Sequence, residues 1–313
     1  MDFVLVFPGQ GSQAPGMGRE LADAFPAARI VFQAADDALG VNLSALCFHG
    51  PADELTLTHN AQPALLAHGA AVWAVVREAL AGRVRAAGGH SLGEFTAYHA
   101  AGSLGLADGV RLVRRRGQLM YDSGVARPGT MAAVLGNTTQ PIDAICARAT
   151  AEAGLVVPAN YNSPGQVVIS GEAAGVERAM VLAKELGAKR AIKLNVSGAF
   201  HSPLMESALS GLAQAIADTP FVDANFPVYS NVSADSGTAA TRAREVLVKQ
   251  LTSPVRWTDE VLAMAAAHPE ATFLEMGPGS VLVGLLKKIA PQLRAMACGT
   301  PADVQRLMEL VAT

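Results

Sequence analysis

Charged residues are scarce in this chain. They make up 16% of its 313 residues, and the formal net charge at pH 7 is only −3. So small a net charge gives no general attraction to nucleic acid or to an anionic membrane, and we expect neither as a partner. Hydrophobic residues make up 50% of the chain, so disorder is not expected. The length and composition predict a globular protein with one large or two smaller domains.

Cysteine is also rare. Cys47, Cys146 and Cys298 are the only three, and they lie far apart in the sequence. Three scattered cysteines suggest neither a disulfide framework nor a metal cluster, so no metal site is predicted. We expect each thiol to be a small core residue.

Long hydrophobic runs are missing. The longest apolar stretch, residues 65–76, contains His68 and is too short to span a bilayer. The first residues lead directly into a short apolar segment without a basic region, so we expect no signal peptide. A cytoplasmic location is therefore the expectation.

The motif Gly89-His90-Ser91-Leu92-Gly93-Glu94 stands between a predicted strand end at residues 84–87 and a helix-forming stretch at residues 94–101. A serine with this spacing of glycines between a strand and a helix is typical of a nucleophile elbow. Glycine on both sides gives the sharp turn the space it needs, and the first N–H groups of the helix can hold an oxyanion. The alternative is a glycine-serine loop in an ordinary connection.

Elsewhere, predicted strands alternate with predicted helices, which indicates an α/β fold with a mostly parallel sheet. The expected strands lie at residues 3–7, 84–87, 228–231 and 271–275, and the expected helices at residues 18–24, 27–38, 63–80, 106–120, 204–217, 246–251 and 281–289.

The middle of the chain has a different order of elements. Residues 130–135, 155–160, 166–170 and 190–194 favour strands, and residues 141–151 and 176–186 favour helices. Strand, helix, strand, strand, helix, strand is the ferredoxin-like order. We therefore predict an inserted small subdomain at residues 127–198, with residues 1–126 and 199–313 forming the large one.

Arg116 falls within the apolar arc of the helix predicted for residues 106–120, when positions are spaced at about 100° per residue. A guanidinium is costly there unless it meets an anion. One interpretation is a core salt bridge to Asp or Glu. The other is a bidentate site for a substrate carboxylate.

Seven motifs, taken together in this order, resemble the malonyl-CoA:acyl-carrier-protein transacylases, the acyltransferases of fatty-acid and polyketide synthesis. The resemblance covers nearly the whole chain and implies an α/β-hydrolase-like large subdomain with a ferredoxin-like insert. The motifs are Phe7-Pro8-Gly9-Gln10-Gly11-Ser12-Gln13, Gly89-His90-Ser91-Leu92-Gly93-Glu94, Arg116-Gly117, Asn160-Tyr161-Asn162-Ser163-Pro164-Gly165-Gln166, Gly198-Ala199-Phe200-His201, Gln250 before a Ser-Pro-Val segment, and Glu275-Met276-Gly277-Pro278-Gly279.

The resemblance also implies roles for single residues. Ser91 would be the acylated nucleophile and His201 its general base and acid. Arg116 would bind the free carboxylate of malonyl. The remaining roles are an oxyanion hole formed by the backbone N–H groups of Gln10 and Leu92, a backbone carbonyl of Gln250 that orients the histidine, and a substrate pocket that includes Phe200, Asn162 and His90.

Malonyl-CoA and an acyl carrier protein with a phosphopantetheine arm are the implied partners, and CoA is a substrate, so no cofactor is expected. Phe200 resembles the malonyl-selective form of the family, because its ring would crowd an α-methyl group. A free-standing chain of this length fits fatty-acid synthesis or a trans-acting acyltransferase, and we expect a monomer. The candidate docking cations for an acidic carrier are Arg111, Arg114, Arg115, Lys184, Lys189, Arg190 and Lys193.

Two other functions stay open at the level of sequence. A serine hydrolase or thioesterase has the chain order Ser…Asp/Glu…His, and His268 near the C-terminus would then be its base. A carrier-protein docking module with an inactive site is the second alternative. The presence of all the expected reactive groups argues against it.

Overall fold

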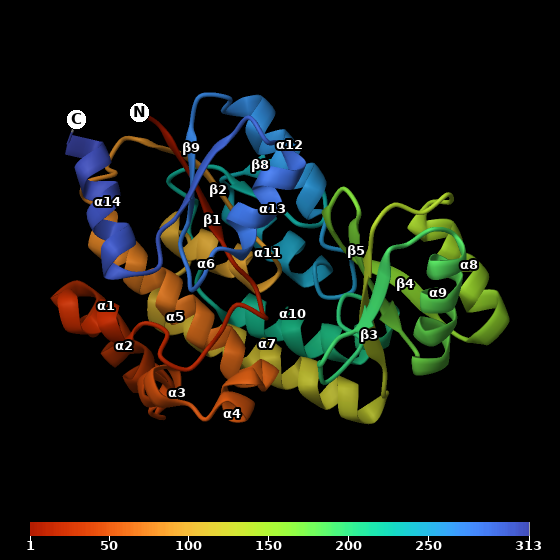
Figure 1. Ribbon diagram of the computed structural model, residues 1–313. Coiled ribbons are helices and arrows are strands. Elements are labelled where there is room, and N and C mark those ends of the chain that lie inside the picture. The colour runs from red at the N-terminus through yellow and green to blue at the C-terminus, as the bar shows by residue number, and fades with distance from the viewer. Residues whose placement is uncertain (313) are drawn as a thin grey trace.

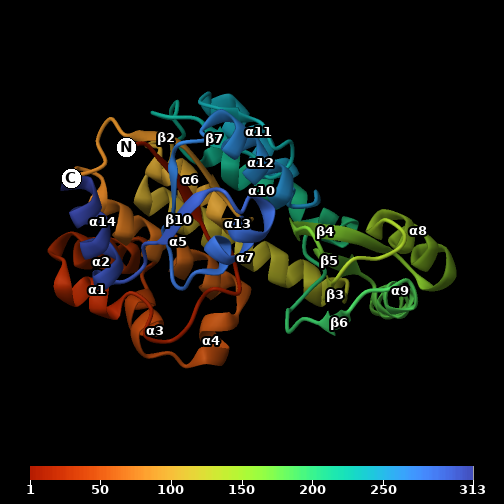
Figure 2. The same ribbon diagram turned by 45° about the horizontal axis from the view of Figure 1, so that its top comes forward.

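The computed structural model describes residues 1–312 and shows two bodies joined side by side (Figure 1). A large body surrounds a six-stranded sheet, and a smaller one carries a separate four-stranded sheet. The view in Figure 2 shows the small body projecting from one end of the large one. A mostly parallel sheet combined with a second, antiparallel sheet confirms the predicted fold class.

The large sheet has the strand order β10-β9-β1-β2-β7-β8, and every neighbouring pair is parallel except β7 with β8. Because β1, β2 and β7 are neighbours, their carboxyl ends meet at one edge of the sheet. Such an edge is where open α/β sheets place their ligands. The strands are β1 (Phe3–Phe7), β2 (Val84–Gly89), β7 (Val228–Tyr229), β8 (Ser236–Gly237), β9 (Thr272–Glu275) and β10 (Arg294–Ala297).

The central strand β1 is buried on both faces, and its side chains alternate between two hydrophobic clusters. Phe3, Leu5 and Phe7 belong to the larger cluster, which also contains residues of the long helices. Val4 and Val6 belong to the second cluster, with Trp257 and its helical neighbours. The period of two along the strand therefore produces helix layers on both faces of the sheet.

The helices of the large body cover these two faces (Figure 1). They are α1 (Arg19–Ala24), α2 (Pro26–Leu39), α3 (Leu43–His49), α4 (Ala52–Thr56), α5 (Thr58–Val76), α6 (Leu92–Ala100), α7 (Leu106–Ala126), the 3₁₀ helix η1 (Pro203–Ala208), α10 (Leu209–Asp218), α11 (Ala240–Lys249), α12 (Trp257–Ala267), α13 (Val281–Ile289) and α14 (Pro301–Ala312).

The prediction that Pro63 begins a helix ending at residue 80 is wrong. Pro63 lies inside α5, which begins at Thr58 and ends at Val76. A proline removes the N–H that would bond to the carbonyl four residues earlier, here that of His59. The His59 carbonyl instead accepts a hydrogen bond of 2.9 Å from Arg114 of α7. A contact from a neighbouring helix therefore satisfies the acceptor that the proline leaves free.

Other helices and strands also have bounds that differ from those predicted. The helix expected at residues 246–251 is the end of α11, which begins at Ala240, and the helix expected at residues 106–120 continues to Ala126. The turn expected at residues 162–165 begins later, because β4 runs to Ser163. No strand was predicted where β10 forms, since its Arg294–Ala297 segment is too short for a clear alternation.

The small body has the topology that its sequence pattern predicts. Its sheet has the order β4-β5-β3-β6, with every neighbouring pair antiparallel, and the two helices pack against each other and on the sheet. Its elements are β3 (Thr130–Leu135), α8 (Ile142–Ala153), β4 (Val156–Ser163), β5 (Gln166–Gly171), α9 (Ala173–Glu185) and β6 (Arg190–Lys193).

Backbone hydrogen bonds join the two bodies at Val255. The Val255 N–H donates to the Ala159 carbonyl at 2.8 Å, and the Tyr161 N–H donates to the Val255 carbonyl at 2.9 Å. The hydroxyl of Thr258 adds a bond of 3.0 Å to the Tyr161 carbonyl. The large body thus contributes a short parallel bridge, Val255 with Asn160, beside strand β4 of the small body.

Within residues 1–312, no helix is both long enough and apolar enough to cross a membrane. The three cysteines are buried and unpaired, as the sequence predicts.

The first turn of α6 packs tightly against the end of β1. A Cβ atom built on Gly93 would lie 2.0 Å from the Phe7 carbonyl oxygen. This carbonyl also accepts a hydrogen bond of 3.0 Å from the His90 N–H, so it has little freedom to move. Glycine at position 93 is therefore a steric requirement of the close approach.

Gly93→Ala is expected to lower the free energy of unfolding by about 1–3 kcal/mol, the usual cost of forcing an extra methyl group into a packed site. Gly284→Ala is the matched control, because Gly284 lies on the exposed face of α13 with open space around its Cα. That control should be neutral or stabilising by up to about 1 kcal/mol. Urea unfolding of both variants gives the comparison, and equal stabilities would contradict the steric requirement.

Candidate active site

Ser91 stands on a strained turn at the carboxyl end of β2. Its φ of 51° and ψ of −104° lie outside the regions that side-chain-bearing residues favour. The strand ends at Gly89 and the helix begins at Leu92, so the serine occupies the corner between them. This is the strand-turn-helix arrangement expected for a nucleophile elbow.

His201 meets Ser91 from a part of the chain that is far away in sequence. Its Nε2 lies 2.8 Å from Ser91 Oγ. Its Nδ1 faces two backbone carbonyls, those of Gln250 at 3.0 Å and Ser253 at 3.2 Å. Since carbonyls only accept hydrogen bonds, Nδ1 carries the proton and Nε2 is left to accept the serine hydroxyl proton.

Burial lowers the pKa of His201 to about 3, and the nearby Arg116 guanidinium adds to the effect. The imidazole is therefore neutral at physiological pH. A neutral imidazole with its Nδ1 proton fixed is the form that a general base requires.

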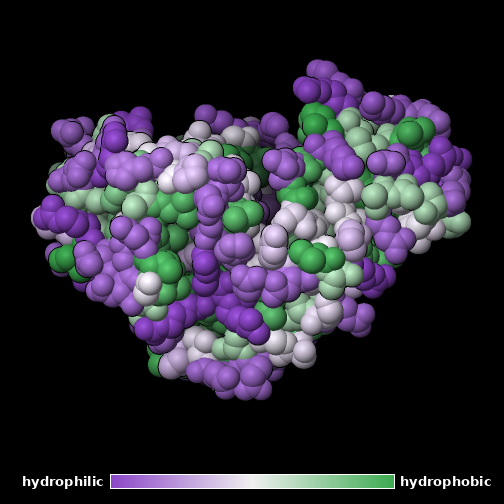
Figure 3. Space-filling view, turned by 90° about the horizontal axis from the view of Figure 1, so that it is seen from below, coloured by the Kyte–Doolittle hydropathy of each residue, from purple (hydrophilic) through white to green (hydrophobic). Residues whose placement is uncertain are grey.

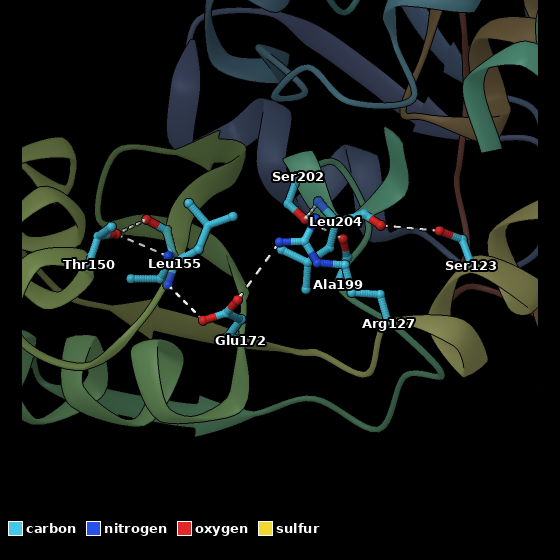
Figure 4. Close-up of polar contacts among 9 residues, drawn as sticks. Ser123, Arg127, Thr150, Leu155, Glu172, Ala199, Ser202 and Leu204 are labelled. Carbon is cyan, nitrogen blue, oxygen red and sulfur yellow. Dashed lines mark hydrogen bonds and ion pairs between the residues drawn. The ribbon is translucent and has the colours of Figure 1, made fainter. Parts of the chain in front are cut away.

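Several contacts hold the loop that carries His201, whose own φ is 56°. The Ser202 hydroxyl donates to the Ala199 carbonyl at 2.6 Å and accepts the Leu204 N–H at 3.2 Å, which caps η1. Ser123 of α7 donates to the Leu204 carbonyl at 3.1 Å. Figure 4 shows these bonds at the junction with the small body, where Arg127 forms an ion pair of 3.8 Å with Glu172.

Arg116 lies 1% exposed on α7, which confirms its place on the apolar face. The salt bridge that the sequence left open does not form, because in the described chain no carboxylate reaches this guanidinium within ion-pair distance. Arg116 instead donates to Gln62 Oε1 at 2.8 Å, Gln250 Oε1 at 2.9 Å and Ser91 Oγ at 3.2 Å. It also lies over the Phe95 ring, 5.3 Å from the ring centre.

A cavity of about 470 Å³ opens between the two bodies. The space-filling view in Figure 3 shows a hollow between them. Its walls bring together eight of the nine predicted site residues, which are Gln10, His90, Ser91, Leu92, Arg116, Asn162, Phe200 and His201. The ninth, Gln250, is buried behind Ser91 and Arg116.

The small body forms one wall of this cavity. Met131, Asn160 and Val168 of its sheet line it, opposite the serine. His90 spans the two bodies through a 2.8 Å hydrogen bond between its Nε2 and Asn162 Oδ1. Gln10 is held on the other side by Thr58, whose hydroxyl donates to Gln10 Oε1 at 2.8 Å.

Asn231 is a site residue that the sequence reasoning missed. Its Oδ1 accepts the Ser91 N–H at 2.7 Å, and its Nδ2 donates to the Gly89 carbonyl and to Glu260, each at 2.7 Å. The signal was its position as the last residue of the strand predicted at residues 228–231. A polar residue at the end of a parallel strand is placed at the ligand-binding edge.

His268, the candidate base of a hydrolase, lies far from this cavity. It stands beside Asp2 and Arg85, at the amino ends of β1 and β2, whereas Ser91 follows the carboxyl end of β2. The histidine that contacts Ser91 is therefore His201. The hydrolase arrangement, in which His268 would be the base, does not form.

Residues 4–304 match the family model described as the acyl transferase domain. The malonyl CoA-acyl carrier protein transacylase of Bacillus subtilis (strain 168) is 47% identical over 300 residues, which cover 96% of this chain and 94% of that protein.

Solved structures of similar proteins have the same fold. The acyl-carrier-protein-S-malonyltransferase from Bartonella henselae superimposes with a TM-score of 0.95 at 40% identity, covering 100% of both chains. A malonyl-transacylase solved in complex with its type II PKS acyl-carrier protein gives a TM-score of 0.94 at 41% identity, covering 99% of this chain and 100% of that one.

The low pKa of His201 predicts how Ser91 responds to pH. Because His201 stays unprotonated well below the ordinary histidine pKa of 6.5, the rate at which an uncharged sulfonyl fluoride modifies Ser91 should stay flat from about pH 8 to about pH 5. The rate should fall only as the pH approaches the pKa of His201. A half-maximal rate near the ordinary histidine pKa would contradict the pKa shift, and His201→Ala supplies the background rate.

Proposed function

This chain belongs to the acyl transferase family, and we propose that it is a malonyl-CoA:acyl-carrier-protein malonyltransferase that works through a malonyl-serine intermediate. The observation that carries the proposal is the meeting of Ser91 Oγ with both His201 Nε2 and Arg116 in one cavity. The first pair activates a nucleophile, and the buried guanidinium suits an acyl group that carries its own carboxylate.

In the first half-reaction, the Ser91 hydroxyl attacks the thioester carbonyl of malonyl-CoA and gives its proton to His201 Nε2. The developing oxyanion is held by the backbone N–H groups of Gln10 and Leu92. The Ser91 N–H cannot serve this role, because it donates to Asn231 Oδ1. The C–S bond then breaks, and the departing sulfur of CoA takes the proton from His201.

In the second half-reaction, the phosphopantetheine thiol of the carrier protein attacks the malonyl-serine ester. His201 accepts the thiol proton and returns it to Ser91 Oγ as the ester bond breaks. The Gln250 and Ser253 carbonyls keep Nδ1–H in place throughout, so the absence of a triad carboxylate is compensated by neutral acceptors.

Arg116 is proposed to bind the malonyl carboxylate, and Phe200, Asn162 and His90 to shape the pocket around the acyl group. Phe200 lies against the same cavity as Ser91, which suits a ring that disfavours an α-methyl substituent. Such a steric preference is worth about 1–3 kcal/mol.

The carrier protein is proposed to approach over the basic residues identified from the sequence. Of these, Arg111 and Arg115 are exposed on α7, although Arg111 also forms an ion pair of 3.6 Å with Asp108. Arg114 is bonded to the His59 carbonyl, and Lys193 is paired with Glu177. The proposal includes three further predictions. Residues 127–198 form the small subdomain and residues 1–126 and 199–313 the large one, the protein is a monomer, and its location is cytoplasmic.

The test is the intact mass of the protein after brief mixing with malonyl-CoA. Wild type is expected to gain one malonyl group and Ser91→Ala none, and adding holo carrier protein should remove the adduct. Release of free malonate and CoA without an adduct would indicate a hydrolase instead. If no CoA is released at all, malonyl-CoA is not the substrate.

Arg116→Ala tests the carboxylate site. Losing a buried charge-assisted partner typically costs about 2–5 kcal/mol, so malonyl transfer should fall by about 30-fold or more. Transfer of an acetyl group, which has no carboxylate, should fall less, so that the malonyl-to-acetyl rate ratio drops. Arg115→Ala, on the exposed face of the same helix, is the matched control and should leave the ratio unchanged. Equal loss of both rates would contradict the role of Arg116.

A further inference from the structure

The Arg116 guanidinium is buried without a counter-ion in direct contact. Its hydrogen-bond acceptors are two side-chain amide oxygens and a hydroxyl, all neutral. Its Nε has no partner although it is buried. A buried cation normally requires a nearby negative charge, because solvation by water is lost.

A buried carboxylate lies close by. Glu94, on the first turn of α6, is 0% exposed. Its Oε2 accepts the Gln250 side-chain N–H at 2.7 Å and the Asn231 N–H at 3.1 Å. Both donors are neutral, so the carboxylate too lacks a direct counter-ion.

The Gln250 side chain joins these two charges. Its Nε2 donates to Glu94, and its Oε1 accepts from Arg116. The positive end of the amide dipole thus faces the carboxylate, and the negative end faces the guanidinium. An amide oriented in this way stabilises both charges at once in a medium of low dielectric.

We propose that Glu94 is the buried counter-charge of Arg116, held one amide away so that the guanidinium keeps its charge and its free donors for the substrate carboxylate. A direct salt bridge would occupy those donors, and the substrate would have to displace it. This inference rests on the proposed function, since it assumes that a carboxylate-bearing acyl group enters the pocket.

Other titratable groups also lie near Glu94, and the cation Arg242 favours its ionised form. Arg242 of α11 and Tyr98 of α6 interact with it electrostatically, besides Arg116 and Glu260. Burial raises the pKa of Glu260 well above its ordinary value, and the Glu94 charge raises it further. Burial raises the pKa of Glu94 only to about 7, because Gln250 and Asn231 donate to it. Of the two buried acids, Glu94 is therefore the one that ionises first as the pH rises.

The arrangement has a consequence for the acyl-enzyme. In the free enzyme Arg116 depends on Glu94 alone, whereas in the malonyl-enzyme the substrate supplies a second anion. Removing the Glu94 charge should therefore harm the free enzyme more than the malonyl-enzyme. A purely structural glutamate would affect both forms equally.

Glu94→Gln tests this, because glutamine keeps the size and an acceptor oxygen but loses the charge. We expect the melting temperature of the free variant to fall, and malonylation to raise it by at least about twice the shift seen in wild type. Intact mass verifies that each sample is malonylated. Equal shifts in the two proteins would overturn the proposal.

Glu275→Gln is the matched control. Glu275 is also 0% exposed, but it accepts the N–H groups of Leu282 and Val283 at the start of α13. Its replacement should lower the melting temperature of the free and malonylated proteins by the same amount. A larger malonylation shift in this control would show that any loss of stability produces the effect, which would also overturn the proposal.

A double-mutant cycle covers the case in which Glu94→Gln fails to fold. The double variant Glu94→Gln/Arg116→Gln has neither charge, so it should be more stable than Glu94→Gln alone. If the double variant is no more stable, the two residues are not charge partners. This measurement needs no substrate, so its result is separate from the proposed function, which fails only if wild type gains no malonyl group.

Discussion

The hydrogen bond between Ser91 and His201 joins two residues that both hold a positive φ, and the rest of the site depends on keeping them there. Such backbone conformations cost about 1–3 kcal/mol each for residues with a side chain, so surrounding contacts must fix them. Asn231 and Gln250 take the N–H and the carbonyl of Ser91, and Ser202 closes the turn after His201. The strain at the nucleophile is thus balanced by side chains that contribute nothing to the chemistry directly.

The strand order explains how these side chains come together. Gln10, Ser91 and Asn231 follow β1, β2 and β7, which are neighbours in the sheet, so all three leave the same edge. His201 and Arg116 come from outside the sheet, on the segment after the small body and on α7. A cavity bounded by strand ends on one side and by the small body on the other suits the proposed reaction, because the acyl group of the proposed substrate would be enclosed there.

Much of the fold could be predicted because the local pattern and the tertiary structure agree. The helix at residues 281–289 and the strand at residues 130–135 have the predicted bounds, and the burial of Arg116 follows from helical periodicity alone. Pro63 was misjudged because the group that satisfies the His59 carbonyl comes from another helix. The sequence around Pro63 does not reveal that Arg114 of α7 lies next to this carbonyl.

Only part of the site could be predicted from the sequence, because several of its contacts join segments that are far apart in the chain. Ser91 and its glycines form a local motif that the spacing reveals. The contacts of Asn231 with Ser91 cross 140 residues of sequence and exist only because β7 pairs with β2. The Ser253 carbonyl also faces His201, and the Gln250 side chain reaches both Arg116 and Glu94. These contacts likewise depend on long-range packing that no single segment encodes.

The bridge at Val255 bears on how such enzymes can be recombined. Residues 250–258 supply the two carbonyls that hold His201 and also pair with β4 of the small body. A chimera that exchanges only residues 127–198 would place a foreign strand against a host segment that orients the histidine. The exchangeable unit is therefore discontinuous: it consists of the small body together with residues 253–258, although more than fifty residues of the large body separate them in the chain.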